Sequence, residues 1–141
     1  SKAVDEWNQP VAPFKIAGNL YYVGASGVSA FLVTDPKGHI LIDSGFRETV
    51  PLVLASIRKL NFKPEDIRFL VASHVHNDHV GGLVELRRLT GAKIVLSVED
   101  APQFERGGLD DPQFGDSLSY EGGKADRLLK DGDTVEVGGT R

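Results

Sequence analysis

Three of the four histidines in this 141-residue chain stand within six residues of one another, together with an aspartate. The stretch reads Ser73-His74-Val75-His76-Asn77-Asp78-His79-Val80-Gly81-Gly82. Neutral imidazole nitrogens and a carboxylate oxygen are ligands that suit a borderline divalent ion such as Zn²⁺. The residue types and their spacing therefore predict a metal site whose ligands are His74, His76, Asp78 and His79.

The histidines fall between a predicted strand and a predicted helix. Residues 67–72 are apolar and rich in strand formers, and apolar residues recur at helical spacing over 83–89, before a stop at Gly91. On an extended backbone His74 and His76 point to the same side, whereas Asp78 and His79, at the entrance of the helix, can face a second point nearby. Two neighbouring metal ions can therefore share this loop.

Two other interpretations of the histidine cluster stay open from the residues alone. The histidines can be solvated loop residues, with Asp78 serving only to cap the helix, because aspartate is favoured at helix starts. The cluster can also be a closed structural zinc site. Such sites usually recruit cysteine, and the chain has none.

The composition fits one globular domain and argues against two kinds of partner. The chain is 40% hydrophobic, which is ordinary for a domain of this length. The net charge is −4, with both signs interspersed and no block of lysine and arginine, so we expect no nucleic-acid or membrane partner. The apolar runs are strand-sized and fall short of the ~20 residues that cross a bilayer.

A β-meander followed by a β-α-β crossover is expected to position the loop. Apolar runs between glycine-bearing or proline-bearing turns predict four strands, at 14–16, 20–23, 29–34 and 39–43. Residues 49–60 have the periodicity of an amphipathic helix that ends at a left-handed Asn61. With the strand at 67–72 this helix forms the crossover, and active sites of α/β sheets tend to form at the carboxyl ends of such strands.

The two ends of the chain are predicted to be less regular. Residues 1–13 are expected to be an extended arm, because each proline disfavours helix in the residue before it. After the second helix we expect a strand at 93–96, a short helix near 101–106 and a long irregular loop at 107–124. Residues 126–129 and 134–137 are expected to pair as a hairpin.

The pattern His-x-His-x-Asp-His after a buried strand resembles the signature of the metallo-β-lactamase superfamily. Four further segments are similar to the N-terminal half of subclass B3 metallo-β-lactamases: 7–14, 19–24, 40–45 and 107–111. The resemblance implies an α/β chain that forms the N-terminal αβ half of the αβ/βα four-layer sandwich. Residues 1–141 would be a single half-domain, with the C-terminal half of the fold outside this chain.

This resemblance implies a zinc-dependent hydrolase that opens the β-lactam ring of antibiotics through a hydroxide bridging two Zn²⁺ ions. Asp78 would be catalytic as well as a ligand, because it would bind the second ion and orient the hydroxide. His79 fits subclass B3, yet the same histidine occurs in related lactone, thioester and phosphodiester hydrolases. These activities stay open, as does a non-catalytic metal-binding fragment.

Five further residues are assigned roles at this stage. Asp43 either bonds the amides of the next turn or, as the resemblance implies, orients a ligand histidine. Trp7 either pins the arm to the body of the protein or contacts substrate, since the family folds this arm over the rim of the active site. Phe114 and Leu118 are either buried under their loop or, by resemblance, line the substrate groove. His39 is expected to be exposed and uninvolved.

In the resembled fold each half supplies metal ligands. This chain would then hold two of three ligands for one ion (His74, His76) and two of three for the other (Asp78, His79). An isolated half would expose an apolar sheet face, so we expect a C-terminal fragment or a second copy to complete it. Residues 1–9 lack the pattern of a secretory signal, and the resemblance favours a mature periplasmic or secreted chain, with which the absence of cysteine is compatible.

Overall fold

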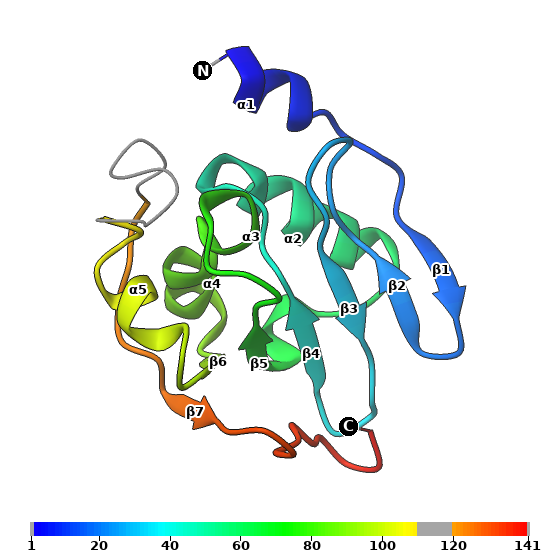
Figure 1. Cartoon of the computed structure of the whole chain (residues 1–141). Coiled ribbons are helices and arrows are strands. Elements are labelled where there is room, and N and C mark those ends of the chain that lie inside the picture. Colours follow the sequence, from blue (N-terminus) through cyan, green and yellow to red (C-terminus); the bar gives the residue numbers. More distant parts are fainter. Residues whose placement is uncertain (1, 110–119, 141) are drawn as a thin grey trace.

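The computed structural model describes residues 2–109 and 120–140. One mixed sheet runs in the order β1-β2-β3-β4-β5-β6-β7, so that each strand pairs with its neighbours in sequence (Figure 1). The strands are β1 (Phe14–Ala17), β2 (Leu20–Tyr22), β3 (Phe31–Val33), β4 (His39–Ile42), β5 (Ile67–Val71), β6 (Lys93–Ser97) and β7 (Arg127–Leu129). Strands β1 to β4 are antiparallel, and β4 to β7 run parallel. The predicted α/β class, meander and crossover are confirmed.

The helices are α1 (Lys2–Trp7), α2 (Val50–Lys59), α3 (Asn77–Val80), α4 (Leu83–Thr90) and α5 (Ala101–Glu105), with 3-10 turns at Arg47–Thr49 and Pro64–Asp66. The predicted stops are confirmed, since Asn61 has φ 66° after α2 and Gly91 has φ 76° after α4. Among the described residues, none of these helices is long and apolar enough to cross a membrane.

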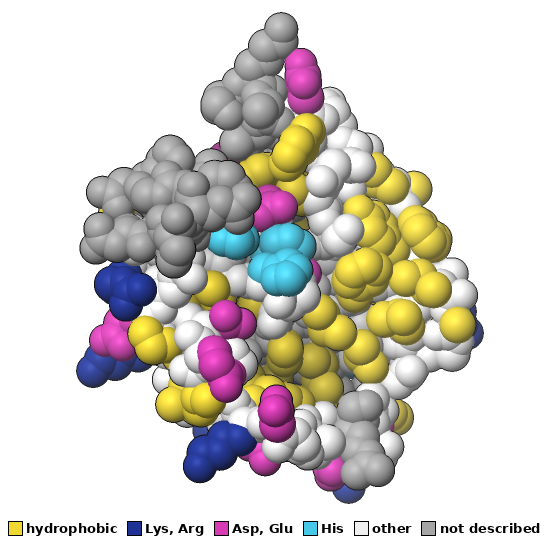
Figure 2. All heavy atoms as spheres, in the orientation of Figure 1, with side chains coloured by type: hydrophobic (Ala, Val, Ile, Leu, Met, Phe, Trp, Pro, Cys, Tyr) yellow, Lys and Arg dark blue, Asp and Glu magenta, His cyan; other side chains and the backbone are white. Residues whose placement is uncertain are grey.

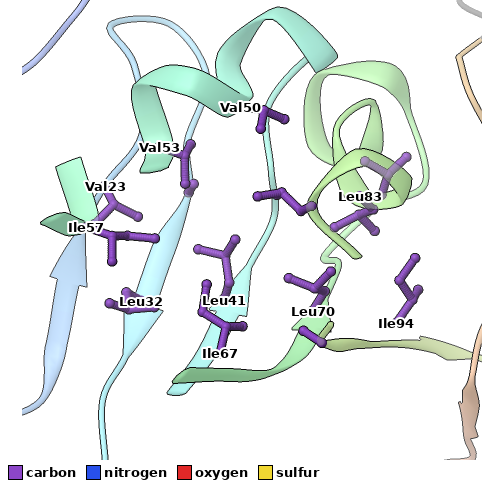
Figure 3. Packing of buried hydrophobic residues seen from close by; sticks show 14 of the residues in the cluster. Val23, Leu32, Leu41, Val50, Val53, Ile57, Ile67, Leu70, Leu83 and Ile94 are labelled. Carbon is purple, nitrogen blue, oxygen red and sulfur yellow. The ribbon is translucent and has the colours of Figure 1, made fainter. Parts of the chain in front are cut away.

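Helices α2 and α4 pack on one face of the sheet and enclose the core (Figure 3). The strands supply alternate side chains to this core, and the helices supply the residues at helical spacing that the sequence predicts. Its fully buried members include Val23, Leu32, Leu41, Leu70 and Ile94 from the sheet side and Val53, Ile57, Leu83 and Leu86 from the helices. This packing fixes the carboxyl ends of β4 and β5, where the histidine loop begins.

The opposite face of the sheet carries a row of apolar side chains, which we call the open sheet face. The strand register aligns its members across five strands: Phe14, Tyr22, Phe31, Ile42 and Val71. Aromatic contacts continue along the row, with ring centroids 5.3 Å apart for Phe14 and Tyr22 and 5.6 Å apart for Tyr22 and Phe31. Phe14 is 50% exposed. Figure 2 shows hydrophobic side chains gathered on the side of the histidines toward β1 and β2.

The expectation of an extended N-terminal arm is wrong for its first half, because Lys2–Trp7 form helix α1. Pro10 and Pro13 restrict only the residues directly before them, so they place no constraint on a helix that has already ended at Trp7. Residues 8–13 have neither helix nor strand, as expected.

The predicted C-terminal hairpin is also wrong. The turn itself forms, since Lys130 N–H donates to Asp133 Oδ2 at 2.9 Å. However, β7 pairs in parallel with the edge of β6, and Val137 makes an isolated bridge to Thr140 instead. After α5 the chain returns to a free edge of the parallel sheet. Residues 127–129 therefore pair with β6, which is distant in sequence, and not with residues 134–137.

His39 is buried, 6% exposed, although the sequence suggested an exposed residue. Its ring packs edge-on against Phe62, with centroids 5.2 Å apart, and its Nδ1 accepts from the Asp35 amide at 3.4 Å. The turn between β3 and β4 signalled exposure, but His39 is also the first residue of a strand in the middle of the sheet. It lies at the opposite end of β4 from Asp43, so it remains outside the histidine loop.

Burial lowers the pKa of His39 below its ordinary value of 6.5 by disfavouring the imidazolium, and Arg68 adds to this while Asp66 and Asp35 oppose it. The unfolded chain therefore binds the proton more tightly than the folded chain. We therefore expect the free energy of unfolding to be unaffected by protonation of His39 above pH 6.5 and to decrease as the pH falls below 6.5. Urea unfolding at pH 7.5 and 5.5 checks this, because a His39→Gln variant should lose less stability between the two than the wild type. Equal losses would contradict the prediction.

Candidate metal centre

The predicted site lies at the carboxyl edge of β4 and β5, which run parallel. Asp43 follows β4, and Ser73 follows β5. The pairing continues one step beyond the strands, because the Asp43 amide donates to the Val71 carbonyl at 2.7 Å. The histidine loop, residues 74–79, then passes over this edge and enters the short helix α3 (Figure 1).

Asp43 places a buried carboxylate beneath this loop. Its Oδ1 accepts from the Ser73 amide and its Oδ2 from the Ser73 hydroxyl, both at 2.7 Å. Oδ2 also lies 2.9 Å from His79 Nδ1. Asp43 is 3% exposed and has φ 65°, a conformation that aspartate tolerates better than most residues. These bonds join β4, β5 and α3 at one point.

The Asp43 contact sets the tautomer of His79. A carboxylate accepts hydrogen bonds, so Nδ1 carries the proton, and in the neutral ring Nε2 keeps a free lone pair. An imidazole whose outer N–H is held by a carboxylate is the usual arrangement of a metal-binding histidine. The contact therefore orients the His79 ring with Nδ1 toward Asp43, and Nε2 lies 3.5 Å from Asp78 Oδ2.

Ser44 fixes the backbone of the same histidine. Its amide donates to the His79 carbonyl at 2.8 Å, and its hydroxyl lies 3.1 Å from that oxygen. The hydroxyl also accepts from the Gly82 amide at 3.0 Å. Ser44 is fully buried, so these bonds face no competition from water. The start of α4 is thereby attached to the turn after β4.

The remaining predicted ligands lie around His79. The rings of His74 and His79 meet edge to face, with centroids 5.1 Å apart. His76 caps α3, and its carbonyl accepts from the His79 and Val80 amides at 2.9 and 3.0 Å. The Asp78 side chain is 38% exposed. Figure 2 shows histidine side chains at the surface.

Across residues 2–109 and 120–140, no three His, Asp or Glu side chains are grouped so as to hold one metal ion. This agrees in number with the sequence analysis, which predicts that this chain supplies two of the three ligands of each ion. Each metal ion would need a further donor from outside this chain. The residues present do fit zinc chemically, because imidazole and carboxylate are its ligands and Asp43 prepares His79 to bind. The ligand assignment stays a prediction.

Of the three residues predicted to contact substrate, the structure describes only Trp7. Trp7 ends α1 and is 47% exposed, and its ring lies 6.4 Å from that of Phe46. This contact pins the N-terminal segment, and the exposed part of the ring leaves a substrate role as a prediction. Phe114 and Leu118 lie outside the described residues.

Three residues that hold the loop had no assigned role from sequence. Ser73 and Ser44 stand next to residues already singled out, and a serine beside a strand end was a usable signal for a backbone hydrogen bond. Tyr120 donates from its phenol to the Val75 carbonyl at 2.5 Å. Tyr120 lies 45 residues from Val75 in the sequence, and no local pattern in the sequence predicts that the two residues meet.

Residues 23–141 match the metallo-β-lactamase superfamily. The fold is similar to that of a β-lactamase from Chitinophaga pinensis, with 44% identity and a TM-score of 0.91 over 95% of this chain and 51% of that one. It is also similar to LRA-12, a class B3 di-zinc metallo-β-lactamase from an Alaskan soil metagenome, with 37% identity and a TM-score of 0.91 over 94% of this chain and 51% of that one. A hydroxyacylglutathione hydrolase of Serratia proteamaculans is 30% identical over 79% of this chain and 35% of its own length.

The chain belongs to the metallo-β-lactamase superfamily. Its structural neighbours include class B3 enzymes, and it corresponds to the N-terminal half of their fold. The chain spans about half the length of these solved structures and about a third of the curated relative.

Proposed function

We propose that this chain is the N-terminal half of a zinc-dependent hydrolase that opens β-lactam rings, and that it supplies part of the metal site. The observation that carries the proposal is the Asp43–His79 contact of 2.9 Å, because it presents His79 Nε2 as a metal ligand. The similarity to β-lactamases at 37–44% identity supports the substrate class. A bound divalent ion would supply water of lowered pKa at neutral pH.

Different residues of the chain would bind the metals, position a ligand and contact the attacking water. His74, His76 and His79 would bind the metals, and Asp43 would keep the His79 ring in place. Asp78 would ligate the second metal, and its exposed carboxylate would accept a hydrogen bond from the attacking water. Water adds to the lactam carbonyl, the carbon–nitrogen bond breaks, and the proton taken from water passes to the departing nitrogen.

We further propose that the open sheet face is covered by the other half of the fold, from a C-terminal fragment or a second copy. The face carries a row of apolar residues across five strands, and soluble monomers rarely tolerate large contiguous apolar surfaces. The missing metal donors would come from the same partner. A chain that stays a single 15.3 kDa monomer in every preparation, without loss of activity, would refute this.

A hydrolysis assay with and without chelator tests the proposed function. We expect the completed protein to bind two Zn²⁺ tightly, to hydrolyse a β-lactam, to lose activity in EDTA and to recover it with zinc. The 141-residue chain alone should bind zinc weakly and release it readily to chelator. Hydrolysis that persists after complete metal removal would contradict the proposal.

A second candidate is another hydrolytic activity of the superfamily. It is favoured by the hydroxyacylglutathione hydrolase match, since that relative has a different substrate. The same assay with a lactone, a thioester and a phosphodiester separates the activities. If the completed protein binds metal but hydrolyses none of these substrates, the chain is a metal-binding fragment without catalysis.

A further inference from the structure

Tyr120 reaches the histidine loop from a distant part of the sequence. Its phenol donates to the carbonyl of Val75, with 2.5 Å between the two oxygens. Val75 stands between His74 and His76, and its side chain is buried in the core. The bond therefore acts on the peptide group that joins Val75 to His76. Because that group is planar, fixing its oxygen also restricts how the backbone enters His76.

Tyr120 is itself held on two sides. Its ring lies against Phe104, which is fully buried, with centroids 5.9 Å apart and an interplanar angle of 30°. Its amide donates to the Gly107 carbonyl at 2.9 Å. A side chain at Gly107 would clash with the Tyr120 carbonyl oxygen, so the two backbone segments lie close together. Both the ring and the backbone of Tyr120 are thus held by the segment from Phe104 to Gly107.

We propose that Tyr120 is a positioning residue for the metal centre. It bonds the loop between His74 and His76, whereas Asp43 bonds the two ends of the loop, at Ser73 and at His79, and Ser44 bonds the His79 carbonyl. Without the phenol, the imidazoles of His74 and His76 would spend less time in one orientation, and metal affinity would fall. The consequence for metal binding rests on the proposed function, whereas the effect on the loop does not.

Tyr120→Phe tests the effect on the loop, because it keeps the ring against Phe104 and removes only the donor. The amides of His79 and Val80 report on the loop, since both bond to the His76 carbonyl. We expect their hydrogen exchange to become about three- to tenfold faster in the 141-residue chain. Exchange at the core amide of Leu70 should change little.

Tyr22→Phe is the matched control. Its phenol also donates to a backbone carbonyl at 2.5 Å, that of Ala25, in a different loop. It should leave exchange at His79 and Val80 unchanged. If Tyr120→Phe has no effect on these amides, or accelerates the Leu70 amide equally, Tyr120 is only a structural residue and the proposal fails.

Cobalt(II) titration adds a spectroscopic test of the metal centre. We expect the visible spectrum of the cobalt complex to change in Tyr120→Phe and its Kd to rise about threefold or more relative to the wild type. Faster loop exchange with unchanged cobalt affinity and spectrum would overturn the positioning role. If the wild type binds no cobalt, the proposed metal-dependent function is contradicted for this chain. The amide exchange experiment then still decides whether Tyr120 holds the loop.

Discussion

Asp78→Asn is expected to reduce β-lactam hydrolysis by the completed protein about 10²- to 10⁴-fold, the usual contribution of a positioned proton acceptor. The substitution keeps the size of the side chain and removes its charge and its basicity. Stability should change by less than about 1 kcal/mol, because the Asp78 side chain is 38% exposed and water solvates its charge. Initial rates and urea unfolding measure the two effects.

Glu65→Gln is a suitable control for this variant. Glu65 is also exposed and ionically paired, with Arg58 at 4.0 Å, and lies outside the histidine loop. It should leave both the rate and the stability nearly unchanged. Full hydrolysis by Asp78→Asn with zinc bound would remove Asp78 from the mechanism.

Asp43→Asn is expected to weaken zinc binding about 10- to 100-fold, although Asp43 is predicted to touch no metal. Asparagine tolerates the positive φ, and its carbonyl can still accept from the Ser73 amide. Its amide group, however, would face the His79 Nδ1 proton with a donor. His79 would have to give up that bond or move its proton to Nε2, the atom needed for the metal.

The same substitution should lower the free energy of unfolding by about 1–3 kcal/mol, because a buried carboxylate that satisfies Ser73 and His79 is lost. Asp126→Asn is the control, since Asp126 also accepts from a strand amide, that of Ile94, at 2.8 Å. It should cost stability without changing zinc affinity. The Nδ1 and Nε2 chemical shifts of His79 report the tautomer directly, and an unchanged tautomer with unchanged zinc affinity would disprove the argument.

Asp78→Asn and Asp43→Asn compare the effects of removing an exposed carboxylate and a buried carboxylate from the same site. Asp78 should matter for hydrolysis and little for folding, whereas Asp43 should matter for folding and for metal binding together. The difference follows from solvent, because an exposed charge is screened and a buried one depends on its protein partners.

Most of the fold was predictable because its signals are local. The apolar run of β4, the periodicity of α2 and the left-handed stop at Asn61 each depend on a few neighbouring residues. The errors occurred where a long-range contact wins over a local tendency. His39 is buried against Phe62 despite the adjacent turn, and β7 pairs with β6 instead of forming a hairpin.

The sequence by itself determined which side chains the histidine loop offers for chemistry, because three imidazoles and a carboxylate stand close together at positions 74–79. It also placed that loop after a buried strand. Only the tertiary structure decided how the loop is held. Asp43, Ser44 and Tyr120 come from separate segments, and packing of the sheet against α2 and α4 brings Asp43 and Ser44 to the loop. Tyr120 is brought there by its contact with the buried Phe104.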